Sequence, residues 1–145
     1  MIAQEIIDFI TNNQVATICG SADDTPYCFN CMYATTEKNG YLVFKSSPDT
    51  RHADILMHNN KVAGTILPEK FEPTAIRGIQ FEGVAVLEDE DSLAPATSAY
   101  YAKYPIAMAM PGKIWIVELL SIKFTDNTKG FGYKRAWSRY EEVFA

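Results

Sequence analysis

An asparagine–glycine pair, Asn39-Gly40, separates two short runs of residues that favour β-strands, "YCFNCMYAT" (27–35) and "YLVFKSS" (41–47). Both residues of the pair tolerate a positive φ angle, so this pair between two such runs is a strong signal for a β-hairpin. Strands joined by a hairpin are antiparallel. The pair therefore favours an antiparallel sheet over a parallel α/β sheet.

The rest of the chain continues this pattern of short strands. Further strands are predicted at 14–20, 61–67, 75–88 and 113–125, and residues 130–137 are predicted to form a seventh strand or a closing loop. Apolar residues at helical spacing predict helices at 2–12, 51–58 and 91–105. We therefore expect a mainly β (α+β) fold, an antiparallel barrel of six to seven strands with an N-terminal helix and two inserted helices.

The length and composition limit the classes of protein that this chain can be. Its 145 residues, with no linker or repeat, fit a single domain over residues 1–145. A net charge of −5 argues against a nucleic-acid partner, which normally meets a basic face. No apolar run approaches the ~20 residues of a membrane helix. The N-terminal segment carries acids rather than the basic residues of a secretory signal, so we expect a cytoplasmic location and no membrane association.

The cysteines do not form a recognisable metal motif. Cys28 and Cys31 have C-x-x-C spacing, but they fall in a predicted strand, where side chains three apart point to opposite faces. We therefore expect no metal site. An odd number of cysteines, three, without a pairing framework fits a reducing compartment.

Hydroxyl and cationic side chains gather where the third predicted strand meets the second predicted helix. The hydrogen-bond donors at this corner are the side chains of Ser46, Ser47, Thr50, Arg51 and His52. Thr50 is the predicted N-cap, and the amides of the first helical turn and the helix dipole favour an anion beside it. The planar guanidinium of Arg51 can bind two phosphate oxygens. The corner is therefore a candidate phosphate site.

A second interpretation of the corner needs no ligand. In it, Thr50 only caps the helix, Asp49 satisfies the helix dipole, and Arg51 and His52 are solvated. The carboxylate of Asp49 favours this interpretation because it would repel a phosphate. The chain contains no G-x-G-x-x-G and no P-loop sequence that would mark a nucleotide site elsewhere. The residues alone leave both interpretations open.

Three longer stretches resemble a known superfamily. They are "YLVFKSSPDTRHADILMHNNKVAGTI" (41–66), "RGIQFEGVAVLEDEDSLAPATSAYYAKYP" (77–105) and "IKFTDNTKGFGYKRAW" (122–137). In this order they look like the FMN-binding split barrel of the pyridoxamine 5′-phosphate oxidase-like superfamily, and within it most like the YhbP family. The likeness runs from about residue 14 to residue 138. It implies a split β-barrel that binds FMN, and a homodimer with two cofactor sites at the subunit interface.

The resemblance also assigns roles at the corner. Ser46 takes the position of the strand-end hydroxyl, Thr50 that of the hydroxyl at the helix start, and Arg51 that of the arginine beside the flavin phosphate. His52 replaces a lysine, which leaves a weaker, pH-dependent cation. Ser47 adds a further hydroxyl.

Other positions depart from the true oxidase. By register from Gly40, two second-strand positions that are cationic in the oxidase hold Phe29 and Ala34, and Lys45 is the neighbouring cation that could compensate. The C-terminal stretch has no Arg-x-His motif for the oxidase's substrate. We therefore do not expect a true pyridoxamine 5′-phosphate oxidase.

Two further residues are assigned to the flavin ring. Gln80 lies on the polar face of the fifth strand, where it can hydrogen-bond the ring or satisfy the barrel interior. Asn127 lies where the last strand of the superfamily approaches the flavin of the partner, although its neighbours are also typical of a turn.

The function expected from these observations is that of a flavin-dependent oxidoreductase of unknown substrate. Catalytic residues cannot be assigned, because the chain shows no acid–base pair. The alternatives are a non-catalytic flavin carrier or sensor, a haem-binding split barrel with His52 or His58 as the ligand, and an interaction module that has lost its cofactor.

Overall fold

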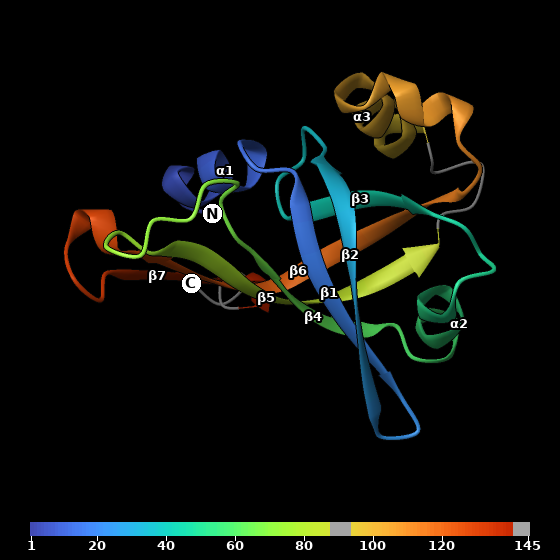
Figure 1. Cartoon of the computed structure of the whole chain (residues 1–145), viewed down its shortest axis with the longest axis horizontal. Coiled ribbons are helices and arrows are strands. Elements are labelled where there is room, and N and C mark those ends of the chain that lie inside the picture. Colours follow the sequence, from blue (N-terminus) through green and yellow to red (C-terminus); the bar gives the residue numbers. More distant parts are fainter. Residues whose placement is uncertain (88–93, 141–145) are drawn as a thin grey trace.

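The computed structural model describes residues 1–87 and 94–140 (Figure 1). Its helices are α1 (Gln4–Thr11), α2 (Arg51–His58) and α3 (Ala94–Lys103), with short 3₁₀ helices at Pro105–Ala109 and Asn127–Lys129. Its strands are β1 (Val15–Ala22), β2 (Thr25–Thr35), β3 (Tyr41–Ser46), β4 (Lys61–Ile66), β5 (Arg77–Leu87), β6 (Lys113–Asp126) and β7 (Lys134–Ser138). None of the described helices is long and apolar enough to cross a membrane.

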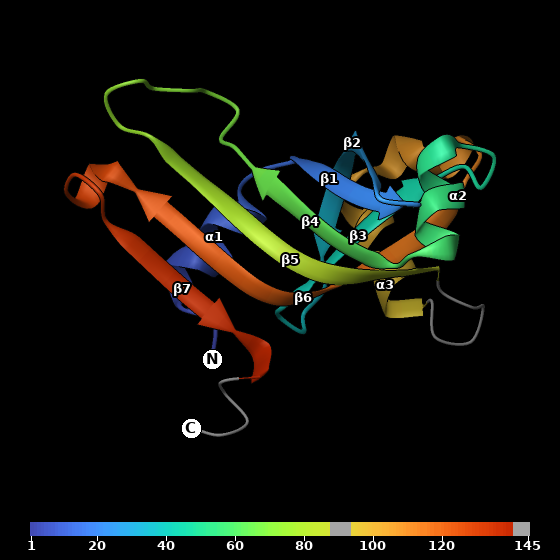
Figure 2. The ribbon, with the colours of Figure 1, turned by 90° about the horizontal axis from the view of Figure 1, so that it is seen from below.

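The strands form one antiparallel sheet that closes on itself. Their order is β3-β2-β1-β4-β5-β6-β7, and β3 also pairs with β6, which closes six of the strands into a barrel. The long β6 makes this closure possible, because one edge of it pairs with β3 near its start and with β7 near its end. Figure 2 shows β7 at the outer edge of the sheet, beyond the barrel.

Two different turns build the first hairpins. Asp23 and Asp24, both with positive φ angles of 52° and 60°, join β1 to β2 in a two-residue turn, which is the pattern of a type I′ turn. The predicted hairpin at Asn39-Gly40 is confirmed, but its loop spans five residues, 36–40. In that loop Gly40 has a positive φ angle of 95°, and Asn39 does not share this conformation.

The core lies inside the barrel and under α1. Inward-facing residues of the strands alternate with outward-facing ones, as along β1, where Ala16 and Ile18 are buried. Gly64 of β4 lets the ring of Phe81 approach the backbone, since a Cβ at this position would lie 2.3 Å from the ring and 2.5 Å from the Thr17 carbonyl oxygen. A smaller cluster of Ala34, Val43, Tyr100, Tyr104 and neighbours packs α3 against the outer side of β2 and β3.

The predicted elements are confirmed along most of the chain. The helix predicted at 51–58 has these bounds in the structure, and the segment at 130–137, which was predicted as a strand or a loop, contains β7. The predicted helix at 91–105 is present from Ala94, and its first residues, 91–93, lie outside the described part of the chain.

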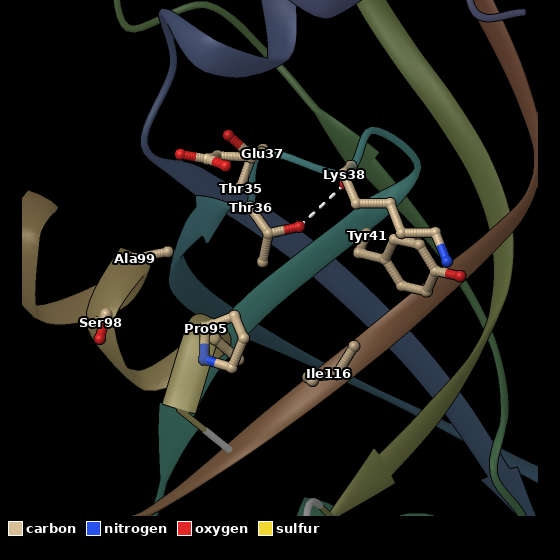
Figure 3. A pocket seen from close by; sticks show the side chains of 10 residues that line it. Thr35, Thr36, Glu37, Lys38, Tyr41, Pro95, Ser98, Ala99 and Ile116 are labelled. Atoms are coloured by element: carbon tan, nitrogen blue, oxygen red, sulfur yellow. Dashed lines mark hydrogen bonds between the residues drawn. The ribbon is translucent and has the colours of Figure 1, made fainter. Parts of the chain in front are cut away.

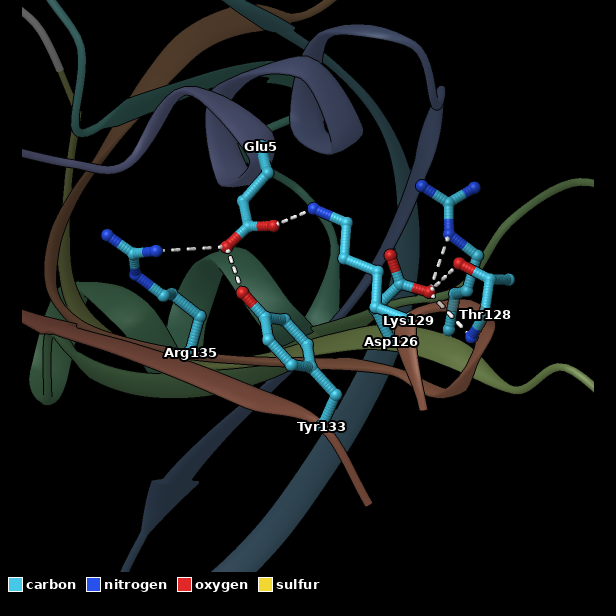
Figure 4. A network of polar contacts seen from close by, with 7 residues as sticks. Glu5, Asp126, Thr128, Lys129, Tyr133 and Arg135 are labelled. Atoms are coloured by element: carbon cyan, nitrogen blue, oxygen red, sulfur yellow. Dashed lines mark hydrogen bonds and ion pairs between the residues drawn. The ribbon is translucent and has the colours of Figure 1, made fainter. Parts of the chain in front are cut away.

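A polar network fastens α1 to the end of the sheet (Figure 4). The carboxylate of Glu5 accepts hydrogen bonds from Lys129 and from the Tyr133 hydroxyl, the latter at 2.8 Å, and pairs with Arg135 at 3.4 Å. The hydrogen bonds from Lys129 and Tyr133 lower the pKa of Glu5. The side chain of Glu5 is only 16% exposed. Its polar contacts therefore connect the N-terminal helix to the segment between β6 and β7 and to β7 itself.

We expect Glu5→Gln to lower the free energy of unfolding at pH 7. Because the folded-state pKa of Glu5 lies below its unfolded value of about 4.3, the stabilisation is present above that pH and is lost as the pH falls through the folded-state pKa. Urea unfolding should therefore show a smaller difference in the free energy of unfolding between variant and wild type at pH 3.5 than at pH 7. Glu72→Gln is the control, because Glu72 pairs with exposed Lys70 only at 3.9 Å. An equal effect of Glu5→Gln at both pH values would contradict this assignment.

Candidate functional site

The predicted phosphate corner, residues 45–52, lies where β3 ends at the mouth of the barrel and α2 begins. Thr50 is the N-cap, as predicted, since its side chain accepts a hydrogen bond from the Ala53 amide at 3.2 Å. Its hydroxyl in turn donates to the Ser47 carbonyl oxygen at 2.9 Å. This cap satisfies the Ala53 amide and leaves the amides of Arg51 and His52 as the first-turn donors that have no intrahelical partner.

His52 and Ser46 meet at this corner. His52 Nε2 and Ser46 Oγ are 2.5 Å apart, and the imidazole ring stacks on Phe29 of β2 with centroids 3.9 Å apart and planes 9° apart. Burial lowers the pKa of His52, so the imidazole is neutral at pH 7 in the ligand-free protein. Phe29 and His52, the residues at two positions that are expected to be cationic in the oxidase, therefore form a stacked aromatic pair beside the Ser46 hydroxyl.

Arg51 points along the β1–β2 hairpin. Its guanidinium lies over the ring of Tyr27, 4.2 Å from the centroid, and the side chain is exposed. A stacked guanidinium at an exposed site is held by only about 0.5–1 kcal/mol. Arg51 is thus placed beside the corner without a strong partner of its own.

The side chain of Lys45 is bound by α3 and by the 3₁₀ segment that follows it. Its ammonium donates to the Tyr101 hydroxyl at 2.7 Å and to the carbonyl oxygens of Ala107 and Met110 at 2.8 and 2.6 Å. All three acceptors are neutral, and no ion pair of the described residues includes Lys45. Its hydrogen-bonding capacity is filled, but its positive charge is not compensated.

A groove of about 270 Å³ is lined by Lys45, Ser46 and His52 but not by Thr50 or Arg51, and it is called the corner groove below. Phe29, Tyr100 and Tyr104 are aromatic members of its wall, and its polar members include Asn30, Lys45, Ser46 and His52. Its full lining is Phe29, Asn30, Cys31, Met32, Lys45, Ser46, His52, Tyr100, Tyr104, Ile106, Ala107, Met110 and Pro111. A mostly apolar groove with a few convergent polar groups is the usual form of a small-molecule site.

The structure does not bring Gln80 to this groove. Gln80 lies on the outer face of β5, where it lines a second groove of about 460 Å³ together with Thr17, Cys19, Cys28 and Thr65 among others. This is called the Gln80 groove below. Of the two roles considered for Gln80, satisfaction of the barrel interior is excluded, because its side chain is exposed on the outside.

Asn127 lies at the far end of β6. Ser46 pairs with Lys113 at the start of that strand, and Asn127 follows Asp126 at its end, about 46 Å further along the strand at ~3.3 Å per residue. The Asn127 side chain accepts a hydrogen bond from the Gly132 amide at 2.9 Å, so within this chain it serves a turn. Only a second copy of the chain could bring an Asn127 to the corner.

Ala34, the other second-strand position that is expected to be cationic in the oxidase, is buried under α3. It is 1% exposed and packs beneath α3 with Tyr100 and Tyr104. A larger hollow, of about 740 Å³, lies between the β2–β3 hairpin and the start of α3 (Figure 3). Its labelled residues include Thr35, Lys38 and Pro95, and none of the predicted site residues lines it.

The sequence analysis missed the aromatic partners of the site. Tyr27 and Phe29 alternate with Cys28 along β2, so the alternation could have shown that both lie on one face of the strand, but not that α2 covers that face. No local signal could have shown that Tyr101 and the 3₁₀ segment after α3 hold Lys45, because they lie more than 50 residues away in the chain.

Comparisons with known proteins place the chain in a family. No family model matches it. A UPF0306 protein of Serratia proteamaculans is 34% identical over 136 residues, which cover 94% of both chains. A UPF0306 protein of Yersinia pseudotuberculosis is 33% identical, covering 93% of this chain and 92% of its own. The chain belongs to the UPF0306 family. This is the YhbP-like family that its motifs resemble.

The fold of this UPF0306 chain is also that of solved structures with little sequence identity. A haem-binding protein from Mycobacterium smegmatis has a TM-score of 0.76 at 19% identity, covering 90% of this chain and 55% of its own. An FAD-binding protein from Mesorhizobium loti has a TM-score of 0.68 at 15% identity, covering 84% and 92%. A putative pyridoxamine 5′-phosphate oxidase from Listeria innocua has a TM-score of 0.65 at 14% identity, covering 83% and 95%. These structures confirm the split-barrel fold.

We expect Lys45→Met to destabilise the protein whether or not a ligand binds. The substitution leaves the carbonyl oxygen of buried Ala107 without its donor, and an unsatisfied buried group costs about 1–3 kcal/mol, while water can replace the donor at the exposed Met110 carbonyl. Urea unfolding measures the loss. Lys61→Met is the control, because Lys61 is exposed at the start of β4. A stability equal to that of the wild type would show that the three contacts contribute nothing.

Proposed function

We propose that this UPF0306 protein is an FMN-binding flavoprotein that binds the flavin phosphate at the corner of β3 and α2. The observation that supports this most is the corner groove, where an uncompensated cation, Lys45, lies beside the hydroxyl–imidazole pair of Ser46 and His52. An anion at this place would be attracted by Lys45 and by the start of the α2 dipole.

The residues of the corner fit a phosphate in chemical terms. Ser46 and the first-turn amides of α2 are neutral donors, and Arg51 can leave Tyr27 at little cost to bind phosphate oxygens through its two-pronged guanidinium. His52 is neutral in the free protein, and a nearby dianion would favour its protonated form. Asp49 is exposed and its amide donates to Ser47 Oγ at 3.3 Å, which ties Asp49 into its own turn.

The flavin ring would lie along the aromatic part of the groove. Phe29 and Tyr100 line that part of the groove, and Ser46 and His52 would contact the phosphate end. Bound FMN would accept a hydride or electrons, and the residues of this chain would bind and orient it and limit the access of water. We propose that the protein is a flavin-dependent oxidoreductase, whose substrate is a small molecule.

We further propose that two copies of the chain form the complete site. At about 270 Å³ the corner groove is slightly smaller than the roughly 300–1,000 Å³ of a typical ligand pocket. Its rim carries exposed apolar side chains, with Ile106 80%, Met108 70% and Met110 60% exposed. A second chain packed on this rim would cover them and enlarge the site.

We expect Arg51→Ala to weaken FMN binding at least tenfold. A charge-assisted hydrogen bond is worth about 1.5–3 kcal/mol, and each 1.4 kcal/mol is about tenfold in the dissociation constant. Titration of the apoprotein with FMN, followed by the quenching of flavin fluorescence, measures the change. Lys70→Ala, which removes the same charge in the loop between β4 and β5, is the control. Equal affinities of Arg51→Ala and wild type would mean that the phosphate lies elsewhere, and no binding by wild type would refute the proposed function.

Reduction of the bound flavin separates an oxidoreductase from a flavin carrier. Anaerobic NADPH or NADH should bleach the yellow absorbance of the FMN complex if the protein is an oxidoreductase that uses these donors. Stoichiometric FMN that stays oxidised with either donor would favour the carrier or sensor.

A haem-binding function is the second candidate, and one observation favours it. His58 Nδ1 lies 2.8 Å from the Asp54 carbonyl oxygen, a contact that raises the pKa of His58 and, when the ring is neutral, leaves Nε2 as the nitrogen available to a metal. His58 also lines a groove of about 520 Å³ with Met57 and Leu87. His52, by contrast, is held by Ser46 and Phe29.

Titration with hemin tests this candidate. A Soret band that appears with the wild type and is lost in His58→Ala, but not in His52→Ala, would favour haem over FMN. If hemin gives the same spectrum with the wild type and His58→Ala, His58 is not the ligand.

A further inference from the structure

The turn at the end of the first hairpin fixes which residues of β1 and β2 face each other. With Asp23 and Asp24 as the two turn residues, Ala22 pairs with Thr25, and the register then places Cys19 directly opposite Cys28. A two-residue turn allows no other register without a change of turn type. The pairing of the two cysteines is therefore set by the hairpin itself.

Both thiols lie on the same outer face of the hairpin. Along β1 the buried residues Ala16 and Ile18 alternate with the outward-facing Thr17 and Cys19. On the same face, two residues along, the Thr17 hydroxyl donates to Asn30 Oδ1 at 2.6 Å, so opposite side chains there are close enough to contact each other. Cys19 and Cys28 both line the Gln80 groove, and Cys28 is exposed.

The backbone spacing fits a disulfide. Directly opposite residues of an antiparallel pair have Cα atoms about 4.5 or 5.5 Å apart, and disulfides span about 4.4–6.8 Å. In the reduced protein the Cys19 thiol donates to the Gly20 carbonyl oxygen at 3.6 Å, and the neighbouring Cys19 is the main cause of the raised pKa of Cys28. Cys31, in contrast, faces the core, and burial raises its pKa to about 12.

We propose that Cys19 and Cys28 are a reversible dithiol site, which closes to a disulfide by exchange with an oxidised low-molecular-weight thiol such as glutathione disulfide. This inference is independent of any cofactor. The site forms part of the wall of the Gln80 groove, so its oxidation replaces two hydrogen-bonding thiols of that wall with an apolar bridge. Reversible disulfides of this kind are the ones expected in a reducing compartment.

The exchange is balanced without any further reactant. The thiolate of Cys28, the more exposed of the two, attacks one sulfur of the small disulfide and releases one small thiolate. The thiolate of Cys19 then attacks Cys28 Sγ in this mixed disulfide, the Cys28–glutathione bond breaks, and the second small thiolate leaves. The two protein thiols lose two electrons to the small disulfide, and their two protons end on the two released thiols.

Thiol counting and mass spectrometry test the proposal. The fully reduced protein is incubated with glutathione disulfide, quenched with acid, and its thiols are counted after denaturation. We expect the loss of two of the three thiols, a mass lower by two hydrogen atoms, and a proteolytic fragment that links Cys19 to Cys28. Dithiothreitol should restore all three thiols.

Single variants make the test specific. Cys31→Ala should still lose its two remaining thiols as one internal disulfide. Cys28→Ala should form no internal disulfide and should carry at most a glutathione adduct. The proposal is overturned if the wild type keeps three thiols, stops at a glutathione adduct, links either cysteine to Cys31, or forms disulfide-linked dimers on a non-reducing gel.

Discussion

The pairing of β3 with β6 is the interaction on which the rest of the structure depends. It closes six strands into a barrel, buries Trp115 against Phe44, and places the end of β3 opposite the start of β6. Ser46 is thereby fixed at the mouth of the barrel, and the 3₁₀ segment before β6 is brought over Lys45. The geometry of the corner is therefore a consequence of barrel closure and not of the local sequence alone. The short loop between β3 and α2 contributes only Thr50, the N-cap of α2.

The fold was more accessible to prediction from the sequence than the site. Alternation and turn residues are local signals, so the strands, α1 and α2 were predicted close to their observed bounds. The site depends on long-range contacts. The sequence indicated the Thr50 cap, but it could not show that Lys45 is held by Tyr101, or that Asn127 lies at the far end of β6. The roles of the predicted site residues toward a cofactor remain predictions.

The stacked pair of Phe29 and His52 changes the electrostatics of the corner. A lysine and an arginine would hold a phosphate at any pH near neutrality, whereas a buried imidazole is neutral until an anion favours its protonation. The fixed positive charges beside Ser46 are then Lys45, whose donors are already occupied, and Lys113, the cross-strand partner of Ser46. A phosphate bound here would rely more on Arg51 and on the α2 amides than in a site with fixed cations on the second strand.

Strand β2 contributes to both grooves, with four consecutive residues, Phe29 to Met32, at the corner groove and Cys28 at the Gln80 groove. Ser46 has the same inward orientation as Phe44 at the barrel mouth, while Gln80 points outward from β5. The two grooves approach each other on the outer face, because Asn30 of the corner groove accepts a hydrogen bond from Thr17 of the Gln80 groove at 2.6 Å. A ligand at the corner that also contacts a glutamine at this position would take it either across Asn30 and Thr17 of the same chain or from the outer face of a second chain.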